Sequence, residues 1–239
     1  MDLVTNACLL ALLTAPLVAL ALWSARDRRW APAALFLGLL ALDDLLTSLP
    51  QAVGALDVVP GAWNWEGKAL SLAGALAFVA LGPLTTGEAG LTLRRRAGSV
   101  RPALLATLAL TAASFGLGLL FGGGPPEAET VAFQLTAPGL AEEVAYRGVF
   151  IGVLHRALPS ADGARCWWPV VVTAVTFGLW HGLGIQDGAV SFDTLSASFP
   201  LVGGLAYGWL RERTGSVAFP VVAHNLGNTA ALVGAALAG

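Results

Sequence analysis

Charged side chains are scarce in this chain, and lysine is almost absent. Only 12% of the 239 residues are charged, against about 25% in ordinary soluble domains, and the mean hydropathy is +0.73. Lys68 is the single lysine among the 13 basic residues. So few charges cannot cover a water-facing surface, and the composition therefore excludes an ordinary soluble domain and indicates a membrane protein.

Cysteine and net positive charge are lacking as well. The two cysteines, Cys8 and Cys166, stand too far apart in the sequence for a disulfide framework or a metal-ligand spacing. The formal net charge is −2, so the chain has no basic footprint that would indicate nucleic-acid binding. Arginine in place of lysine, together with abundant alanine and glycine, is typical of a GC-rich bacterial genome, and we expect a bacterial source.

Long apolar runs fill most of the chain. A membrane-spanning helix needs about 20 mostly apolar residues. The sequence predicts eight spans, at residues 3–23, 31–49, 68–87, 102–122, 131–155, 167–186, 196–210 and 217–238. The predicted fold class is all-α: a polytopic transmembrane helical bundle of about eight spans, forming a single membrane domain over residues 1–239. A Gly/Pro break at residues 122–126 separates four N-terminal spans (1–122) from a C-terminal part (131–239).

Basic residues collect on one side of the predicted membrane. Of the 13 basic residues, Arg147 lies within a span and Lys68 lies on the opposite side. The loops after the odd-numbered spans hold the others, namely Arg26, Arg28, Arg29, Arg94, Arg95, Arg96, Arg101, Arg156, Arg165, Arg211 and Arg213. The positive-inside rule makes those loops cytoplasmic. We therefore expect a multi-pass protein of the bacterial inner (cytoplasmic) membrane with both termini outside the cytoplasm.

The fifth predicted span contains three ionisable side chains. A charge at the bilayer centre costs about 2.5–3.5 kcal/mol, so such groups usually face a partner or a cavity. Glu143 and Arg147 are four residues apart, which predicts an ion pair on one helix face. Glu142 points about 100° away and is predicted to lack a charged partner, a setting that suits general acid–base catalysis. The alternative is a buried ion-pair network that only holds helices together.

Two of the three histidines lie within predicted spans. His181 is in the sixth span, and His224 is in the eighth, four residues before Asn228 and on the same helix face. A lone intramembrane histidine is usually a packing residue with a hydrogen bond. Two histidines, a glutamate pair and an amide on three separate helices favour a working site instead.

These residue types suit hydrolysis of a peptide bond. Glu142 serves as base and then acid, His181 shares or orients the water, and His224 and Asn228 donate to the oxyanion. A serine mechanism is disfavoured because no Gly-x-Ser-x-Gly motif is present. Glu142, His181 and His224 also form a His₂Glu set that suits zinc or another divalent metal. The residues leave both routes open, and we favour the one without a cofactor.

Three short motifs, in order on separate apolar spans, resemble those of the CPBP intramembrane proteases, also called the Abi or CAAX prenyl protease 2 family. They are Glu142-Glu143-x-x-x-Arg147, Phe177-x-x-x-His181 and His224-x-x-x-Asn228. The resemblance covers about residues 130–232. It implies an all-helical bundle with an intramembrane catalytic cavity and the activity of a glutamate-type endopeptidase.

The resemblance also implies roles for individual residues. Glu142 would activate water together with His181, and His224 and Asn228 would stabilise the transition state. Supporting positions are those of Glu143, Arg147 and Phe177. The family was long described as metalloproteases, which keeps the metal alternative open.

Asp43 and Asp44 in the second predicted span are not explained by these motifs. One interpretation is that the span is displaced toward a membrane surface. The other is that the two carboxylates face the cavity and pair with Arg147 or Lys68.

The substrate is expected to be a membrane-embedded or membrane-proximal protein or peptide. The best-known relatives trim prenylated CAAX proteins, whereas bacteria generally do not prenylate proteins, so processing of a C-terminal sorting tail is a second option. The expected partners are this substrate and the lipid bilayer, with no nucleic acid. A non-catalytic peptide-binding scaffold or immunity protein is the main alternative. A transporter is disfavoured because the sequence shows no inverted repeat.

Overall fold

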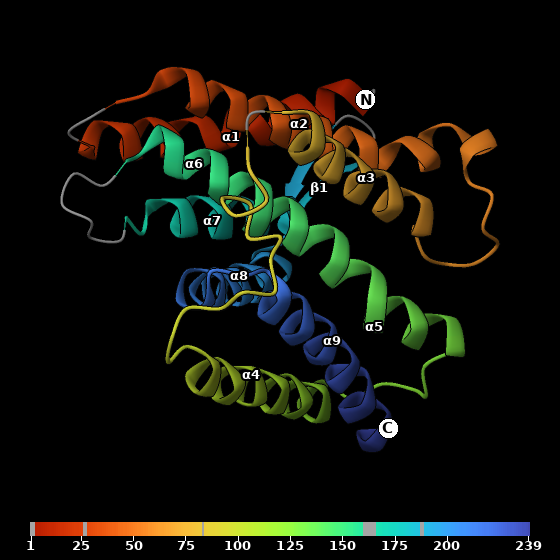
Figure 1. The fold of residues 1–239 in the computed structure, drawn as a ribbon. Coiled ribbons are helices and arrows are strands. Elements are labelled where there is room, and N and C mark those ends of the chain that lie inside the picture. The colour runs from red at the N-terminus through yellow and green to blue at the C-terminus, as the bar shows by residue number, and fades with distance from the viewer. Residues whose placement is uncertain (1–2, 26–27, 83, 160–165, 187–188) are drawn as a thin grey trace.

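The computed structural model describes residues 3–25, 28–82, 84–159, 166–186 and 189–239 as a bundle of helices (Figure 1). Arg26 and Arg165 lie outside the described residues. The helices are α1 (Leu3–Ser24), α2 (Trp30–Ala52), the short 3₁₀ helix η1 (Gly54–Leu56), α3 (Trp65–Leu81), α4 (Val100–Phe121), α5 (Ala128–Glu142), the π-helix η2 (Glu143–Phe150), α6 (Ile151–Ala157), α7 (Trp168–Gly182), α8 (Thr194–Thr214) and α9 (Ala218–Ala238). Strands β1 (Leu183–Gln186) and β2 (Ala189–Phe192) form an antiparallel hairpin between α7 and α8.

The predicted all-α class is confirmed, with this hairpin as the exception. Within the described ranges, four helices are long and apolar enough to cross a membrane, namely α1, α2, α4 and α9. The other four predicted spans fall outside these criteria. Helix α8, which corresponds to the predicted span 196–210, has polar residues along its length and Arg211 and Arg213 in its last turn. Helices α3 and α7 have only 17 and 15 residues, and the α5–η2–α6 segment carries the buried charges of Glu142, Glu143 and Arg147.

Two predicted spans extended too far along the chain. The sixth was predicted to reach residue 186, but α7 ends at Gly182 and residues 183–186 form β1. Glycines 182 and 184 are poor helix formers, and the strand hydrogen bonds to β2 replace the helical ones. The third span was predicted to reach residue 87, but α3 ends at Leu81, where the Gly82 N–H caps the carbonyl of Phe78. The described residues 84–99 form no regular helix or strand.

Helices from the two halves of the chain pack against each other in layers (Figure 1). Helices α1 and α2 lie at the top of the view and contact α7 and α6, while α4 at the bottom lies beside α9. Both ends of the chain lie toward the right of Figure 1, and the C-terminal ends of α1 and α6 and the start of α4 lie toward the left. The described arginines other than Arg147 therefore gather at one end of the bundle, and the two ends of the described chain lie at the other.

Helices α4 and α9 approach closely because glycines face each other's backbone. A Cβ at Gly118 would lie 2.1 Å from the carbonyl oxygen of Ala231, and a Cβ at Gly234 would lie 2.2 Å from that of Phe115. Small residues of this kind allow helix backbones to meet in a membrane, where no hydrophobic effect drives them together. This contact fixes α9, the helix that carries His224.

Gly118→Val is expected to lower the midpoint of thermal unfolding in detergent, because the new side chain meets the backbone of α9. Overpacking of this kind costs roughly 1–3 kcal/mol. Gly116→Val is the matched control, since a Cβ at Gly116 meets nothing within 4 Å. Equal midpoints for the two variants would contradict the proposed close packing.

Candidate active site

Glu142 and Glu143 lie where the α-helix α5 passes into the π-helix η2. All eight residues of η2 are buried. A π-helix has a wider turn than an α-helix and often occurs at functional sites. The Arg147 carbonyl, inside this wide turn, accepts a hydrogen bond from Arg211 Nε of α8 at 3.1 Å. The sequence pattern predicted a regular helix here, because periodicity alone does not reveal one extra residue in a turn.

Glu143 is the centre of the buried polar network. Its Oε1 accepts hydrogen bonds from Arg147 Nη1 at 3.1 Å and from His224 Nδ1 at 2.8 Å. The side chains of Glu143 and Arg147 are both 0% exposed. The predicted ion pair is therefore confirmed. Because Nδ1 of His224 donates to the carboxylate, the other ring nitrogen, Nε2, is left to face Glu142, whose Oε2 lies 3.7 Å away.

Aromatic rings surround the guanidinium of Arg147. Its central carbon lies 4.5 Å from the ring centroid of Phe177, 5.6 Å from that of Tyr207 and 5.7 Å from that of Tyr146. Cation–π attraction of this kind stabilises a charge that water cannot reach. Tyr207 also stacks on the imidazole of His224, with ring centroids 5.2 Å apart. Phe177, predicted as a supporting residue, thus packs directly beneath the network, while both tyrosines were missed.

Glu142 has an ionic partner, and the prediction that it lacks one is wrong. Lys68 Nζ of α3 lies 2.6 Å from Glu142 Oε1, and both side chains are mostly buried. The same ammonium lies 4.7 Å from the ring centroid of Trp180. The helical spacing around Glu142 could not reveal this partner, because Lys68 lies 74 residues earlier in the chain.

The start of α3 is fixed to α2, and this contact places Lys68. Asn64 caps α3 by accepting from the Gly67 N–H at 2.9 Å, and its Nδ2 donates to the carbonyl of Thr47 at 2.7 Å. A Cβ at Gly67 would lie 2.1 Å from that same carbonyl oxygen. Only glycine permits α3 to approach α2 this closely. Gly67 therefore determines how far Lys68 lies inside the bundle.

Asp43 and Asp44 of α2 face the interior of the bundle. Asp43 Oδ1 accepts from the Ser71 hydroxyl at 2.5 Å, and Asp44 Oδ1 accepts from Trp180 Nε1 at 2.6 Å. Lys68 is near enough to attract both carboxylates. The interior interpretation therefore holds, although the direct partners are Ser71 and Trp180 rather than Arg147 or Lys68.

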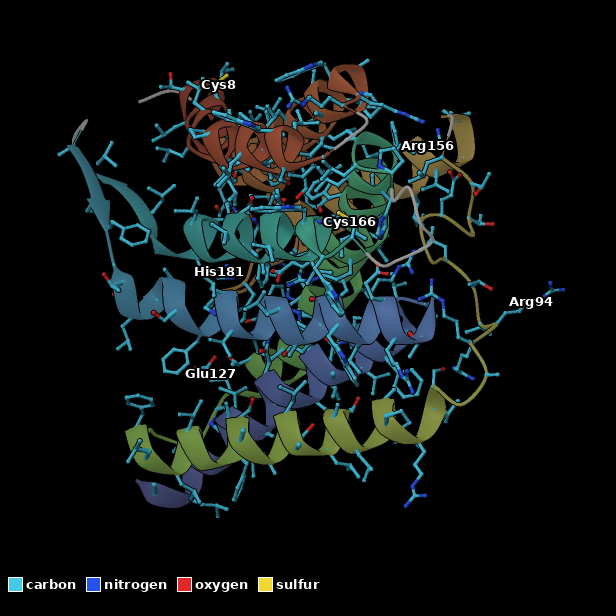
Figure 2. The ribbon with its side chains drawn as sticks, turned by 90° about the vertical axis from the view of Figure 1, so that its left-hand side faces the viewer. Cys8, Arg94, Glu127, Arg156, Cys166 and His181 are labelled. Carbon is cyan, nitrogen blue, oxygen red and sulfur yellow. The ribbon has the colours of Figure 1, made fainter. Side chains whose placement is uncertain are left out.

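His181 lies in the last turn of α7 and does not contact Glu142 directly. Its Nδ1 donates to the carbonyl of Phe177 at 2.8 Å, which leaves Nε2 as the acceptor of the neutral ring. The ring packs edge-on against Phe177 and Trp180, with centroids 4.5 and 4.8 Å apart. His181 is exposed, and Figure 2 shows it on the side of the bundle away from Arg94.

Asn228 and a second asparagine join α9 to α5. Asn228 Nδ2 donates to Gln134 Oε1 at 2.8 Å. Asn225, which sequence reasoning missed, accepts from the Gly139 N–H at 2.8 Å and donates to the Thr136 carbonyl at 3.2 Å. Pro138 could have indicated that α5 needs such a polar partner, because it lies inside α5 and interrupts the helical hydrogen bonds there. Asn225 satisfies the backbone at this interruption, one turn before Glu142.

The polar side chains fit a divalent metal poorly. Among the described residues, no group of three or more His, Cys, Asp or Glu side chains is arranged to hold a metal ion. Glu142 Oε1 is already bound to the Lys68 ammonium, whose charge would repel a dication beside it. His224 has only Nε2 left for a metal, since Nδ1 binds Glu143.

Comparison with known protein families gives one match, to part of the chain. Residues 125–230 match the family model described as Rce1-like, type II CAAX prenyl endopeptidase Rce1-like. No curated protein and no solved structure gives a significant match. The matched region contains all three motifs, whereas Asp43, Asp44 and Lys68 lie outside it.

Lys68→Met is expected to destabilise the protein, because it leaves the Glu142 carboxylate buried without its cation. Breaking a buried ion pair from one side costs about 3–5 kcal/mol. The double variant Lys68→Met/Glu142→Gln should recover part of this loss, since it removes the orphaned charge. Thermal unfolding of both variants and of Glu142→Gln completes a double-mutant cycle. Additive shifts would show that the two side chains are not coupled.

Proposed function

We propose that this chain, whose residues 125–230 match the Rce1-like family model of type II CAAX prenyl endopeptidases, hydrolyses a peptide bond of a membrane-embedded or membrane-proximal protein. The four apolar helices and the match to this family model support a membrane protease. We further propose that Glu142, His181, His224 and Asn228 carry out the reaction.

The proposal is supported chiefly by the unequal surroundings of the two Glu142 oxygens. Oε1 is bound to Lys68 at 2.6 Å. Oε2 is buried and accepts no hydrogen bond from the described protein, and His224 Nε2 lies 3.7 Å from it. Buried polar atoms normally have a partner. A carboxylate with one oxygen fixed and the other available is suited to take a proton from water.

His181 is the proposed second contact of that water. Its backbone hydrogen bond to Phe177 fixes the ring so that Nε2 carries a lone pair. The water oxygen attacks the carbonyl carbon of the scissile bond while its proton passes to Glu142. Glu142 then returns this proton to the amide nitrogen as the carbon–nitrogen bond breaks, which leaves a carboxylic acid and an amine.

His224 and Asn228 are the proposed donors to the oxyanion. With Nδ1 bound to Glu143, His224 donates through Nε2 in its imidazolium form, whose charge Glu143 offsets. The arrangement resembles the support that an aspartate gives to a catalytic histidine. Asn228 uses one N–H for Gln134 and keeps a second for the oxyanion. Lys68 supports the reaction by fixing Glu142.

The proposed substrate carries a cleavable segment near its C-terminus, as a CAAX protein or a protein with a sorting tail does. The proposed location is a bacterial inner membrane, with both termini outside the cytoplasm. The exposed ring of His181, next to the β1–β2 hairpin, is the proposed point at which a peptide reaches the catalytic groups.

Glu142→Gln and His181→Ala are expected to slow processing by about 10²–10⁴-fold, because each removes a group that handles the proton of water. Mass spectrometry of membrane proteins from cells with each variant should show loss of a neo-C-terminus seen with the unaltered chain. Glu127→Gln is the control, since the Glu127 side chain forms no hydrogen bond or ion pair with the described residues and lies outside the three motifs. Unchanged processing with folded Glu142→Gln would instead support a peptide-binding scaffold or immunity protein.

Chelation is expected to leave the activity unchanged, because we propose that Glu142 activates water without a metal. Purified protein should be incubated with EDTA or 1,10-phenanthroline and assayed on the substrate found by the proteomic comparison. Loss of activity that added zinc restores would overturn the metal-free route and favour the Glu142, His181, His224 ligand set.

A further inference from the structure

A cavity of ≈ 550 Å³ opens at the end of the bundle where the arginines gather. It lies between the loop that precedes α4, the C-terminal end of α6 and the C-terminal end of α8. Figure 2 shows two of its lining residues, Arg94 and Arg156, at the side of the bundle opposite His181. Five arginines line it: Arg94, Arg95, Arg96, Arg156 and Arg211.

The cavity carries more positive than negative charge. Two carboxylates line it, and each has a partner. Glu88 binds Arg156 through hydrogen bonds of 2.9 and 2.8 Å, and Glu212 binds His155 at 2.8 Å. Hydrogen bonds from Thr85, followed by the Arg156 guanidinium, lower the pKa of Glu88 to about 2, so it stays charged and neutralises Arg156. Five arginines against two glutamates leave a net charge of +3 with histidine neutral.

Neutral carbonyls, rather than carboxylates, hold two of these arginines in place. Arg211 donates to the backbone carbonyls of Arg147 and Glu88. Arg96 donates to the carbonyl of Glu212. The Glu212 carboxylate attracts the Arg211 guanidinium, and the Arg96 guanidinium repels it. Two neighbouring guanidiniums that are not fully neutralised can bind an anion through charge-assisted hydrogen bonds.

The remaining two arginines are available to a ligand. Neither Arg94 nor Arg95 forms an ion pair with any carboxylate in the described ranges of the chain. Arg95 lies over the ring of Phe219, 5.5 Å from its centroid, and Arg94 is exposed. Arginine is the side chain best shaped to bind phosphate oxygens in pairs.

We propose that this cavity binds the phosphate of an anionic phospholipid at the membrane surface that the basic loops face. Its volume falls in the range of about 300–1,000 Å³ typical of ligand pockets. Basic pockets between transmembrane helices, at this level of a bilayer, bind anionic headgroups. The inference stands apart from the proposed peptidase activity. Bound phosphate would also hold Arg211, which supports the wide turn η2 beneath Glu143.

The test uses the full chain, purified in a neutral detergent, and follows thermal unfolding during titration with phosphatidylglycerol. Parallel titrations use phosphatidylcholine and inorganic phosphate. We expect phosphatidylglycerol alone to raise the midpoint. Arg94→Gln/Arg95→Gln should weaken its apparent affinity by roughly tenfold or more, as expected for the loss of charge-assisted hydrogen bonds.

The matched control is Arg28→Gln/Arg101→Gln, which removes the same charge from the same end of the bundle but outside the cavity. Retained affinity in this control supports the proposal. Equal weakening in both double variants would show attraction to the whole basic surface and overturn it. The same stabilisation by inorganic phosphate alone would overturn the lipid as the source of the phosphate, and no stabilisation by phosphatidylglycerol would overturn the site itself.

Discussion

One carboxylate oxygen, Oε1 of Glu143, accepts hydrogen bonds from both Arg147 and His224, and the surrounding structure depends on keeping that contact buried. A carboxylate and a guanidinium that are both 0% exposed are costly to remove from water, and geometry and further contacts must offset that cost. The rings of Phe177 and Tyr207 enclose the cation. Helical segments η2 and α9 meet at this single atom, and α7 and α8 supply the enclosing rings. This arrangement explains why the histidine of α9 is held so near the glutamates.

The two halves of the chain contribute different parts of the site. The C-terminal half, which contains the region that matches the family model, provides Glu142, Glu143, His181, His224 and Asn228. The N-terminal half provides the lysine that binds Glu142 and the aspartate that binds Trp180 beside His181. Motifs alone would therefore describe an incomplete site. The contacts between α2 and α3 that set the depth of Lys68 belong to the active-site architecture as much as the motifs do.

The sequence was sufficient where local spacing decides the outcome. The i to i+4 pair of Glu143 and Arg147 and most helix positions could be predicted, because helical periodicity and hydropathy are properties of neighbouring residues. The partner of Glu142 could not, since it is distant in the chain, and the same holds for the Asn225 contacts to α5. The π-helix was missed because the apolar pattern around it is continuous. The β1–β2 hairpin was missed because residues 183–186 continue the apolar run of the predicted sixth span.

Lys68 is the single lysine of the sequence, and this has a consequence for chemical labelling. No other side chain in these 239 residues carries a primary amine, so a reagent that acylates lysine side chains has a single target, Lys68, beside the glutamate that we propose to be catalytic. An amine held in an ion pair is a poor nucleophile, because its lone pair is occupied by a proton. A bound peptide or a shift of α3 that separated Lys68 from Glu142 would increase the rate at which the Lys68 amine is acylated. The acylation rate of Lys68 thus reports on the state of the candidate active site.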